Sequence, residues 1–140
     1  MAELTPEARD FLTRGTRTGK LGWVSGDGRA LVAPVWFVVE GDDLLFTTGA
    51  KTSKGQALAR DGRAVLTVDL ERPPYGFVQV QAAVEVTGDV AEVRRIATLT
   101  GARYMGDDRA EEFGARNGVA GELGVRLRPI KVISHFNMTG

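Results

Sequence analysis

The residues best suited to chemistry in this sequence lie in the run TTGAKTSK, residues 47 to 54. Lysines and hydroxyl side chains gather there, at a point where strand-like residues give way to a helix-like stretch. If a strand ends near Thr48 and a helix begins near Ser53, unpaired backbone N–H groups and the positive end of the helix dipole meet Lys51 and Lys54. Helix starts of this kind bind phosphate groups. The run therefore predicts a phosphate site, with Lys54 as its first ligand.

The same run permits a simpler interpretation. Thr52 or Ser53 would cap the helix with its hydroxyl oxygen, and the two lysines would be solvated, as they are on many helices. Spacing alone does not decide between a phosphate site and an ordinary capped helix, so both interpretations stay open at this point.

Other familiar chemistries fit this sequence poorly. The chain has no cysteine, which excludes disulfides, thiolate metal sites and a cysteine nucleophile. His135 is the only histidine, so we expect no histidine metal cluster. The segments GDGRAL and GTRTGKL lack the glycine spacing of nucleotide-binding motifs. The acids between 107 and 112 suit a helix start, and no side chain stands out as a catalytic acid. The catalytic residues, if any, stay unknown.

Composition limits the partners and the compartment. Lys and Arg together count 18, as do Asp and Glu, so the net charge is zero and no global field favours nucleic acid or anionic lipid. No apolar run approaches the roughly 20 residues of a membrane span. The start of the chain lacks the basic and apolar regions of an export signal, so we expect a cytoplasmic protein. A chain of 140 residues predicts one domain, residues 1–140.

Strands are expected to position these residues. The segment LTPEARDFLTRG predicts a short first helix, with Thr5 as its cap and Pro6 at its first position. Residues 19–48 predict three strands joined by two glycine-rich turns. The segments RAVLTVDL, GFVQVQAAVEVTGD and GVRLRPIKVISHF predict three more. The pattern is typical of a mostly β protein, a six-stranded antiparallel β-barrel with peripheral helices.

A longer helix is predicted after Asp89, in VAEVRRIATLTGARYMG. Its expected apolar stripe consists of Val90, Val93, Ile96, Ala97 and Leu99. Residues 101–124 contain six glycines, and we expect them to hold a short helix between mobile loops.

Several of these segments resemble a known superfamily. TSKGQALARDGRAVLTV, VQVQAAVEVTGD and VRLRPIKVISHF are similar to pyridoxamine 5′-phosphate oxidase-like split β-barrels, which bind FMN or the deazaflavin coenzyme F-420. Lys54, inside a Ser53-x-x-x-x-Leu58 pattern, resembles the phosphate-binding segment of that superfamily. APVWF, residues 33–37, resembles the strand that lies along the flavin ring in the F-420-using branch.

The resemblance implies a split barrel that forms a homodimer, with cofactor clefts at the interface. It implies that the cofactor phosphate is bound by Thr48, Lys51, Ser53 and Lys54, and that Pro34, Val35 and Trp36 lie along the ring. It also implies that Tyr75 and Gln79 reach the partner's cofactor, and that His135 and Asn137 border a substrate pocket. Each has a plainer alternative, because Trp36 also suits a barrel core, Tyr75 a proline-rich surface turn and His135 a surface or interface position.

Two departures favour one branch of the superfamily. The FMN-dependent oxidases carry an arginine and a lysine on the strand that here reads ALVAPVWFVVEG, which has no basic residue. They also hold their substrate with an arginine and histidine pair, whereas SHFNMTG has no arginine. The chain looks closer to small actinobacterial F-420-dependent reductases. We therefore expect an F-420-dependent oxidoreductase that reduces an unsaturated small molecule. An FMN flavoprotein and a non-catalytic F-420 or tetrapyrrole-binding module are the alternatives.

Overall fold

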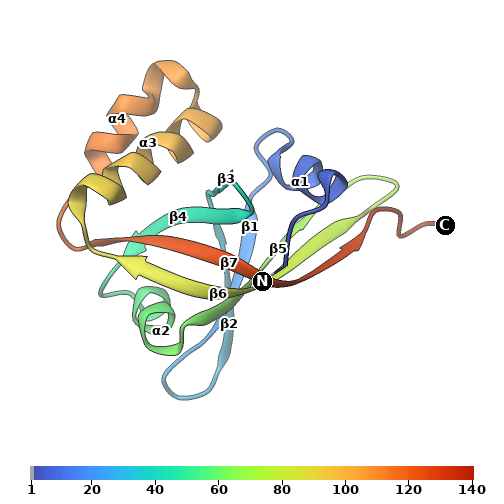
Figure 1. Cartoon of the computed structure of the whole chain (residues 1–140), viewed down its shortest axis with the longest axis horizontal. Helices are drawn as coiled ribbons and strands as arrows, with labels where there is room; N and C mark the ends of the chain where they lie inside the picture. The colour runs from blue at the N-terminus through green and yellow to red at the C-terminus, as the bar shows by residue number, and fades with distance from the viewer. Residues whose placement is uncertain (1) are drawn as a thin grey trace.

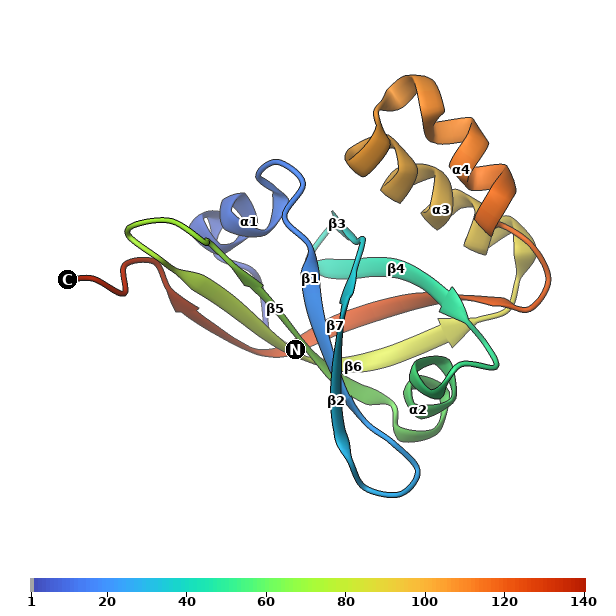
Figure 2. The same cartoon turned by 180° about the vertical axis from the view of Figure 1, so that it is seen from behind.

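The structure, a computed structural model, describes residues 2–140. One curled antiparallel sheet forms the body of the molecule, and helices surround it at three separate places (Figure 1; Figure 2). The strands are β1 Gly19–Val24, β2 Ala30–Val35, β3 Val38–Glu40, β4 Asp43–Gly49, β5 Arg63–Asp69, β6 Phe77–Thr87 and β7 Glu122–His135. The helices are α1 Pro6–Thr13, α2 Ser53–Asp61, α3 Val90–Met105 and α4 Ala110–Asn117, with a short 3-10 turn, η1, at Asp107–Arg109. The predicted class, a mostly β split barrel with peripheral helices, is confirmed.

The sheet has seven strands in the order β2-β1-β5-β6-β7-β4-β3, so the predicted number of six was wrong. The second predicted strand is broken at Trp36 and Phe37. Before this link Pro34 pairs with Lys20 on β1, and after it Val38 pairs with Leu45 on β4. A single run of β-forming residues therefore supplies both edge strands, and the two-residue link joins the opposite edges of the sheet.

Local sequence explains where α1 begins. The hydroxyl oxygen of Thr5 accepts a hydrogen bond from the Ala8 N–H at 3.1 Å, and Pro6 occupies the first helical position. The first turn of a helix leaves backbone N–H groups unpaired: Thr5 accepts from one of them, and Pro6 has no N–H to leave unpaired. The predicted first helix and its cap are confirmed.

The predicted apolar stripe of α3 was only partly right. Val93, Ile96 and Ala97 are buried, but Val90 and Leu99 are 43% and 38% exposed. Thr100 and Gly101 complete the buried face instead. Asp89 stands at the N-cap position directly before the helix, where its backbone carbonyl accepts from the Val93 N–H at 2.9 Å but its side chain forms no capping hydrogen bond.

Residues 101–124 hold the predicted short helix, α4, with less irregular chain around it than expected. The helix α3 ends at Met105, as the predicted segment did to within one residue, and η1 and α4 extend to Asn117. Two glycines let the helices approach closely: a Cβ atom on Gly101 would lie 2.7 Å from the Cβ of Phe113, and one on Gly114 would overlap Thr98. Gly106 and Gly121, by contrast, lie between the elements with positive φ.

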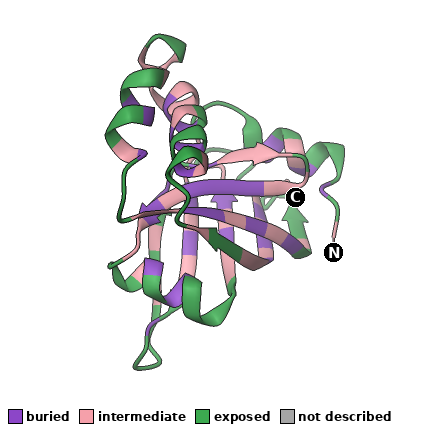
Figure 3. Cartoon of the chain, turned by 60° about the vertical axis from the view of Figure 1, so that its left-hand side comes forward, coloured by how far each residue is buried: buried purple, intermediate pink, exposed green. Residues whose placement is uncertain are grey.

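The core fills the inside of the curled sheet. Buried and less buried residues alternate along the strands (Figure 3). On β6, Val78, Val80 and Ala82 are buried, while Gln79 and Gln81 point to the outer face, as the alternation predicted. The largest fully buried side chains include Leu12, Leu21, Phe37, Phe46, Leu66 and Leu127.

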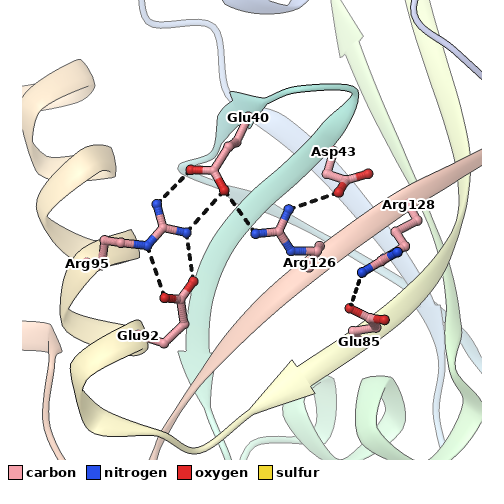
Figure 4. Close-up of polar contacts among 7 residues, drawn as sticks. All are labelled: Glu40, Asp43, Glu85, Glu92, Arg95, Arg126 and Arg128. Atoms are coloured by element: carbon pink, nitrogen blue, oxygen red, sulfur yellow. Dashed lines mark hydrogen bonds and ion pairs between the residues drawn. The ribbon is translucent and has the colours of Figure 1, made fainter.

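An ionic network fastens α3 to the sheet (Figure 4). Glu40 on β3 accepts hydrogen bonds from Arg95 on α3 at 2.6 and 3.1 Å, and from Arg126 on β7 at 3.0 Å. Arg126 also donates to Asp43 at 2.9 Å, and Arg95 to Glu92 at 2.7 and 3.0 Å. The hydrogen bonds from Arg95, and to a smaller extent the bond from Arg126, lower the pKa of Glu40 to about 2.

None of the helices formed by residues 2–140 combines the length and the apolar character that crossing a membrane requires.

Candidate functional site

The junction of β4 and α2 forms the helix start that the sequence predicted. Thr52 is the cap: its hydroxyl accepts a hydrogen bond from the Gly55 N–H at 3.0 Å and donates to the Gly49 carbonyl at 2.8 Å. Ser53 and Lys54 are the first helical residues, and within residues 2–140 their amide N–H groups form no hydrogen bond. The capped helix is therefore real, and it leaves two donors for an anion.

Glycine at position 55 lets the helix start rest directly on the end of β4. A Cβ atom there would overlap the carbonyl oxygen of Gly49 and lie 3.3 Å from the Cα of Ala50. Gly55 is buried, and so is Thr48, the second-last residue of β4. The close contact fixes the direction of the free N–H groups relative to β4.

Lys54 carries the charge of this junction. Its side chain is partly buried, and burial lowers the pKa of its ammonium group, while Glu122 at the start of β7 acts in the opposite direction. Within the described chain, Lys54 has no carboxylate within ion-pair distance. Lys51 and Ser53 are exposed beside it. A bound anion would give this lysine the partner that the chain does not supply.

The link between β2 and β3 holds the residues predicted to meet a ring. Pro34 is exposed on the edge strand, and Val35 is buried in the core, so only its backbone is available to a ligand. The indole of Trp36 is 39% exposed and stacks on Tyr104, with ring centroids 5.1 Å apart and planes 7° apart. Phe113 packs against its edge at 5.8 Å.

Tyr104 and Phe113 were missed by sequence reasoning. Tyr104 lies near the end of the predicted long helix and Phe113 in the stretch expected to hold a short helix between loops, and their contact with Trp36 joins positions about 70 residues apart. No local pattern indicates such a contact. Glu122 was missed for the same reason, because it meets the Lys54 region only through the pairing of β7 with β4.

Gln79 lies on the outer face of the sheet, in one cross-strand row with Pro34. The register places Pro34 opposite Lys20, Lys20 opposite Thr67, and Thr67 opposite Gln79. Directly paired residues share a face, so both predicted residues face the same side of the sheet. They are three strand spacings apart, roughly 14 Å.

Tyr75, His135 and Asn137 gather at one end of the outer face. Tyr75 is exposed in the turn before β6, with a positive φ of 50°. The His135 ring lies parallel to Phe77, with centroids 6.1 Å apart, and its Nε2 is 3.1 Å from the Asn137 carbonyl oxygen. These residues form one group, and the residues around Lys54 form another.

The two groups are far apart in one chain. The start of α2 rests on Gly49, which pairs with Glu122 at the start of β7, and Gly124 on the same strand pairs with Thr87 at the far end of β6. From Phe77 to Thr87 a strand spans about 34 Å. Tyr75 and Lys54 of one chain therefore lie near opposite ends of β6.

A groove with a mostly apolar lining lies elsewhere on the described chain. It has a volume of about 740 Å³ and opens between the β1–β2 hairpin, the end of α2 and the outer face of β5, where Trp23, Leu31, Arg60, Val65 and Ile130 line it. None of the predicted site residues lines it. Arg60 already pairs with Asp61 at 2.8 Å, and most of the lining is apolar. Apart from Arg60 and Arg63, the groove offers few charged groups to an anion.

Comparison with known proteins agrees with this fold. The family model described as pyridoxamine 5′-phosphate oxidase matches residues 4–133. Among solved structures, a conserved hypothetical protein from Mycobacterium tuberculosis is similar, with a TM-score of 0.82 and 22% identity, over 99% of this chain and 87% of that one.

Two further structures show how varied the relatives are. An F-420 reductase matches with a TM-score of 0.69 and 23% identity, over 92% of this chain and 98% of that chain. The heme storage protein HutZ from Vibrio cholerae matches with a TM-score of 0.74 and 15% identity, over 99% and 100%. None of the curated protein sequences compared with the chain matches it. At these identities the likeness establishes the fold.

Proposed function

The chain belongs to the pyridoxamine 5′-phosphate oxidase family, and on that premise we propose that it is an F-420-dependent oxidoreductase. The proposed reaction is the reduction of an unsaturated small molecule by hydride transfer. One observation carries the proposal: Lys54, partly buried and without a carboxylate partner in residues 2–140, stands at a helix start with two free N–H groups. That donor set fits a phosphate group. The similarity to an F-420 reductase supports the choice of cofactor.

The charge of the phosphate group itself favours F-420 over FMN at Lys54. FMN ends in a phosphate monoester, which carries close to two negative charges at neutral pH, whereas the phosphate of F-420 is a diester with one. The side chains that β2 exposes are Ala30, Val32 and Pro34, none of them basic. One partly buried lysine, with Lys51 nearby, matches the smaller charge better.

The chain's own residues would bind and orient the cofactor. Lys54, Ser53 and Thr48 would hold the phosphate, with Lys51 as a second, exposed charge. The exposed face of Trp36 and the backbone of residues 34–36 would lie along the ring, and Trp36 would shield it from water. When bound, F-420 would supply the hydride, since such chemistry belongs to the cofactor.

We also propose that the protein is a homodimer that closes each site with residues of both copies. Val32 and Ile130 are 69% and 58% exposed on the outer face, next to the apolar groove. A face of this kind is typical of an interface. A partner on this face would also bring its own Tyr75 and Gln79 toward Lys54, which one chain cannot do. His135 and Asn137, at the same end as Tyr75, would then border the substrate pocket.

Titrations with F-420 and with FMN test the cofactor. The protein should bind F-420 more tightly than FMN, and reduced F-420 should be consumed in the presence of a cyclic enone. Tighter binding of FMN would favour a flavoprotein of the same fold. Tight binding of F-420 without turnover over a broad panel of unsaturated substrates would favour a binding module. Preferential binding of haem would point to a role like the one named for the Vibrio cholerae relative.

A further inference from the structure

The link between β2 and β3 is held by side chains of α3. Both backbone groups of Phe37 are bonded there: its N–H donates to the Tyr104 hydroxyl at 3.3 Å, and its carbonyl accepts from Arg103 at 2.6 Å. Arg103 also donates to the carbonyls of Leu12 at 2.8 Å and Gly15 at 3.1 Å. The end of α3 thus ties the link to the segment that joins α1 and β1.

Tyr104 acts on this link in two ways. Its ring stacks on Trp36, and its hydroxyl bonds the Phe37 N–H while donating to the Arg17 carbonyl at 2.8 Å. Burial raises the pKa of Tyr104, so the hydroxyl stays protonated and able to donate at neutral pH. Trp36 nevertheless stays 39% exposed.

We propose that Tyr104 is a positioning residue of the cofactor site, which holds the Trp36 ring and the neighbouring backbone in the orientation that a planar ring binds. This inference rests on the proposed function. Tyr104 does not itself reach the cofactor in this scheme, because Trp36 lies between them. The stack fixes the plane of the indole, and the hydroxyl fixes the backbone that carries it.

The two contributions can be separated by substitution. Tyr104→Phe keeps the ring stack and removes the hydrogen bonds to Phe37 and Arg17. Tyr104→Leu removes the stack as well. Leu99→Ala is the matched control, because Leu99 is an exposed apolar residue of the same helix. Each variant is made in a Trp23→Phe background, so that Trp36 is the only tryptophan.

The first measurement needs no cofactor. Acrylamide quenching of Trp36 emission should increase clearly in Tyr104→Leu, change little in Tyr104→Phe, and stay unchanged in Leu99→Ala. The second measurement is affinity for F-420. We expect about a tenfold loss in Tyr104→Leu and about a threefold loss in Tyr104→Phe, with no loss in the control.

Salt dependence separates positioning from general damage. The phosphate contact makes binding weaken with rising salt, and this slope should be the same in wild type and both Tyr104 variants, because only the ring contact is disturbed. If Tyr104→Leu bound F-420 as tightly as the background protein does, the inference would be overturned. If that protein bound neither F-420 nor FMN, the proposed function itself would fail. Should Tyr104→Leu not fold, Tyr104→Phe carries the test, and an affinity equal to that of the background protein would overturn the inference.

Discussion

Two nitrogens of the Arg95 guanidinium on α3 donate hydrogen bonds to the two carboxylate oxygens of Glu40 on β3, at 2.6 and 3.1 Å. The pair joins a helix to an edge strand that has only three residues, so it secures a part of the sheet with little backbone bonding of its own. The same carboxylate meets Arg126 on β7 at 3.0 Å. Three elements therefore depend on one ionised side chain.

This arrangement makes stability depend on acid pH. The pKa of Glu40 is lowered from 4.5 to about 2 in the folded protein, so its contribution is present above about pH 4.5 and is lost as pH falls through about 2. Because the pair is partly exposed and screened, we expect Glu40→Gln to lower the free energy of unfolding by about 1 kcal/mol at pH 7. Urea denaturation at pH 7 and at pH 2 measures this, and the difference should be clearly smaller at pH 2, where about half of Glu40 is protonated in the folded protein.

Glu85→Gln serves as the control for that measurement. Glu85 forms an ion pair with Arg128 at 2.9 Å, and its side chain is 57% exposed. Its loss should change the free energy of unfolding by less than about 0.5 kcal/mol at pH 7. An equal effect of both substitutions would show that the network around Glu40 stabilises the fold no more than one exposed ion pair does.

Lys54 should dominate cofactor affinity. A charge-assisted hydrogen bond to phosphate contributes about 1.5 to 3 kcal/mol, so Lys54→Ala should weaken F-420 binding about ten- to a hundredfold with little change in stability. Lys51→Ala should cost less, because an exposed charge is screened. Fluorescence titration measures both, and rising salt should weaken wild-type binding more than binding by Lys54→Ala. If Lys54→Ala bound F-420 with unchanged affinity, the phosphate site would be misplaced, and this helix start would be an ordinary capped helix.

Affinity for F-420 should also fall at alkaline pH. Burial lowers the pKa of Lys54, so the free protein loses this positive charge at a lower pH than an exposed lysine does. The dissociation constant of wild type should therefore rise as pH increases through that pKa. Lys54→Ala should show a flatter profile between pH 7 and 10, which isothermal titration calorimetry can record. Parallel profiles in the two proteins would assign the dependence to another group.

Gly55 should tolerate no side chain. Because a Cβ atom would overlap the Gly49 carbonyl, Gly55→Ala should push α2 away from β4 and lower the free energy of unfolding by about 1 to 3 kcal/mol. It should also weaken F-420 binding, since the free N–H groups move. Gly88→Ala is the control, because a Cβ there meets nothing within 4 Å. Chemical denaturation compares them, and equal stabilities would show that the helix start can shift at no cost.

The proposed interface can be tested through the edge strand. Wild type should be a dimer by multi-angle light scattering at micromolar concentration. Val32→Lys places a charge on the exposed apolar face and should give monomers that bind F-420 poorly. Val119→Lys is the control, because Val119 is also exposed but lies in the α4–β7 connection. A monomeric wild type that binds F-420 at full strength would contradict a shared site.

Sequence reasoning succeeded where the cause is local. Thr5 and Pro6 mark the start of α1, and the alternation from Val78 to Ala82 marks the buried face of β6, because each pattern involves neighbours in the chain. It failed at Trp36 and Phe37, since both favour strands and nothing near them shows that the chain changes edges there. The predicted stripe of α3 included Leu99, whereas α4 packs on Arg94, Thr98 and Gly101, a contact that only the tertiary structure defines.

The candidate site divides in the same way. The cap at Thr52 and the cluster around Lys54 follow from residues within one helical turn, so the sequence was sufficient to find them. The neighbours Glu122 and Tyr104 come from segments far along the chain, and their contacts depend on strand pairing and helix docking. Whether Tyr75 and Gln79 act on a partner's site depends on assembly, which no pattern in one chain determines.

The two-residue link between β2 and β3 also bears on how the chain folds. The strands β2 and β3, which form the two edges of the sheet, are neighbours in sequence. Bringing these edges close together therefore requires almost no loop closure. The costly closure lies inside the sheet, where β4 pairs with β7 and Leu44 lies opposite Leu127. The entropy of closing such a loop must be paid before the contact stabilises anything. The link between the edges thus adds almost no entropic cost, and the cost of building the sheet falls on two long-range pairings, β1 with β5 and β4 with the C-terminal strand β7.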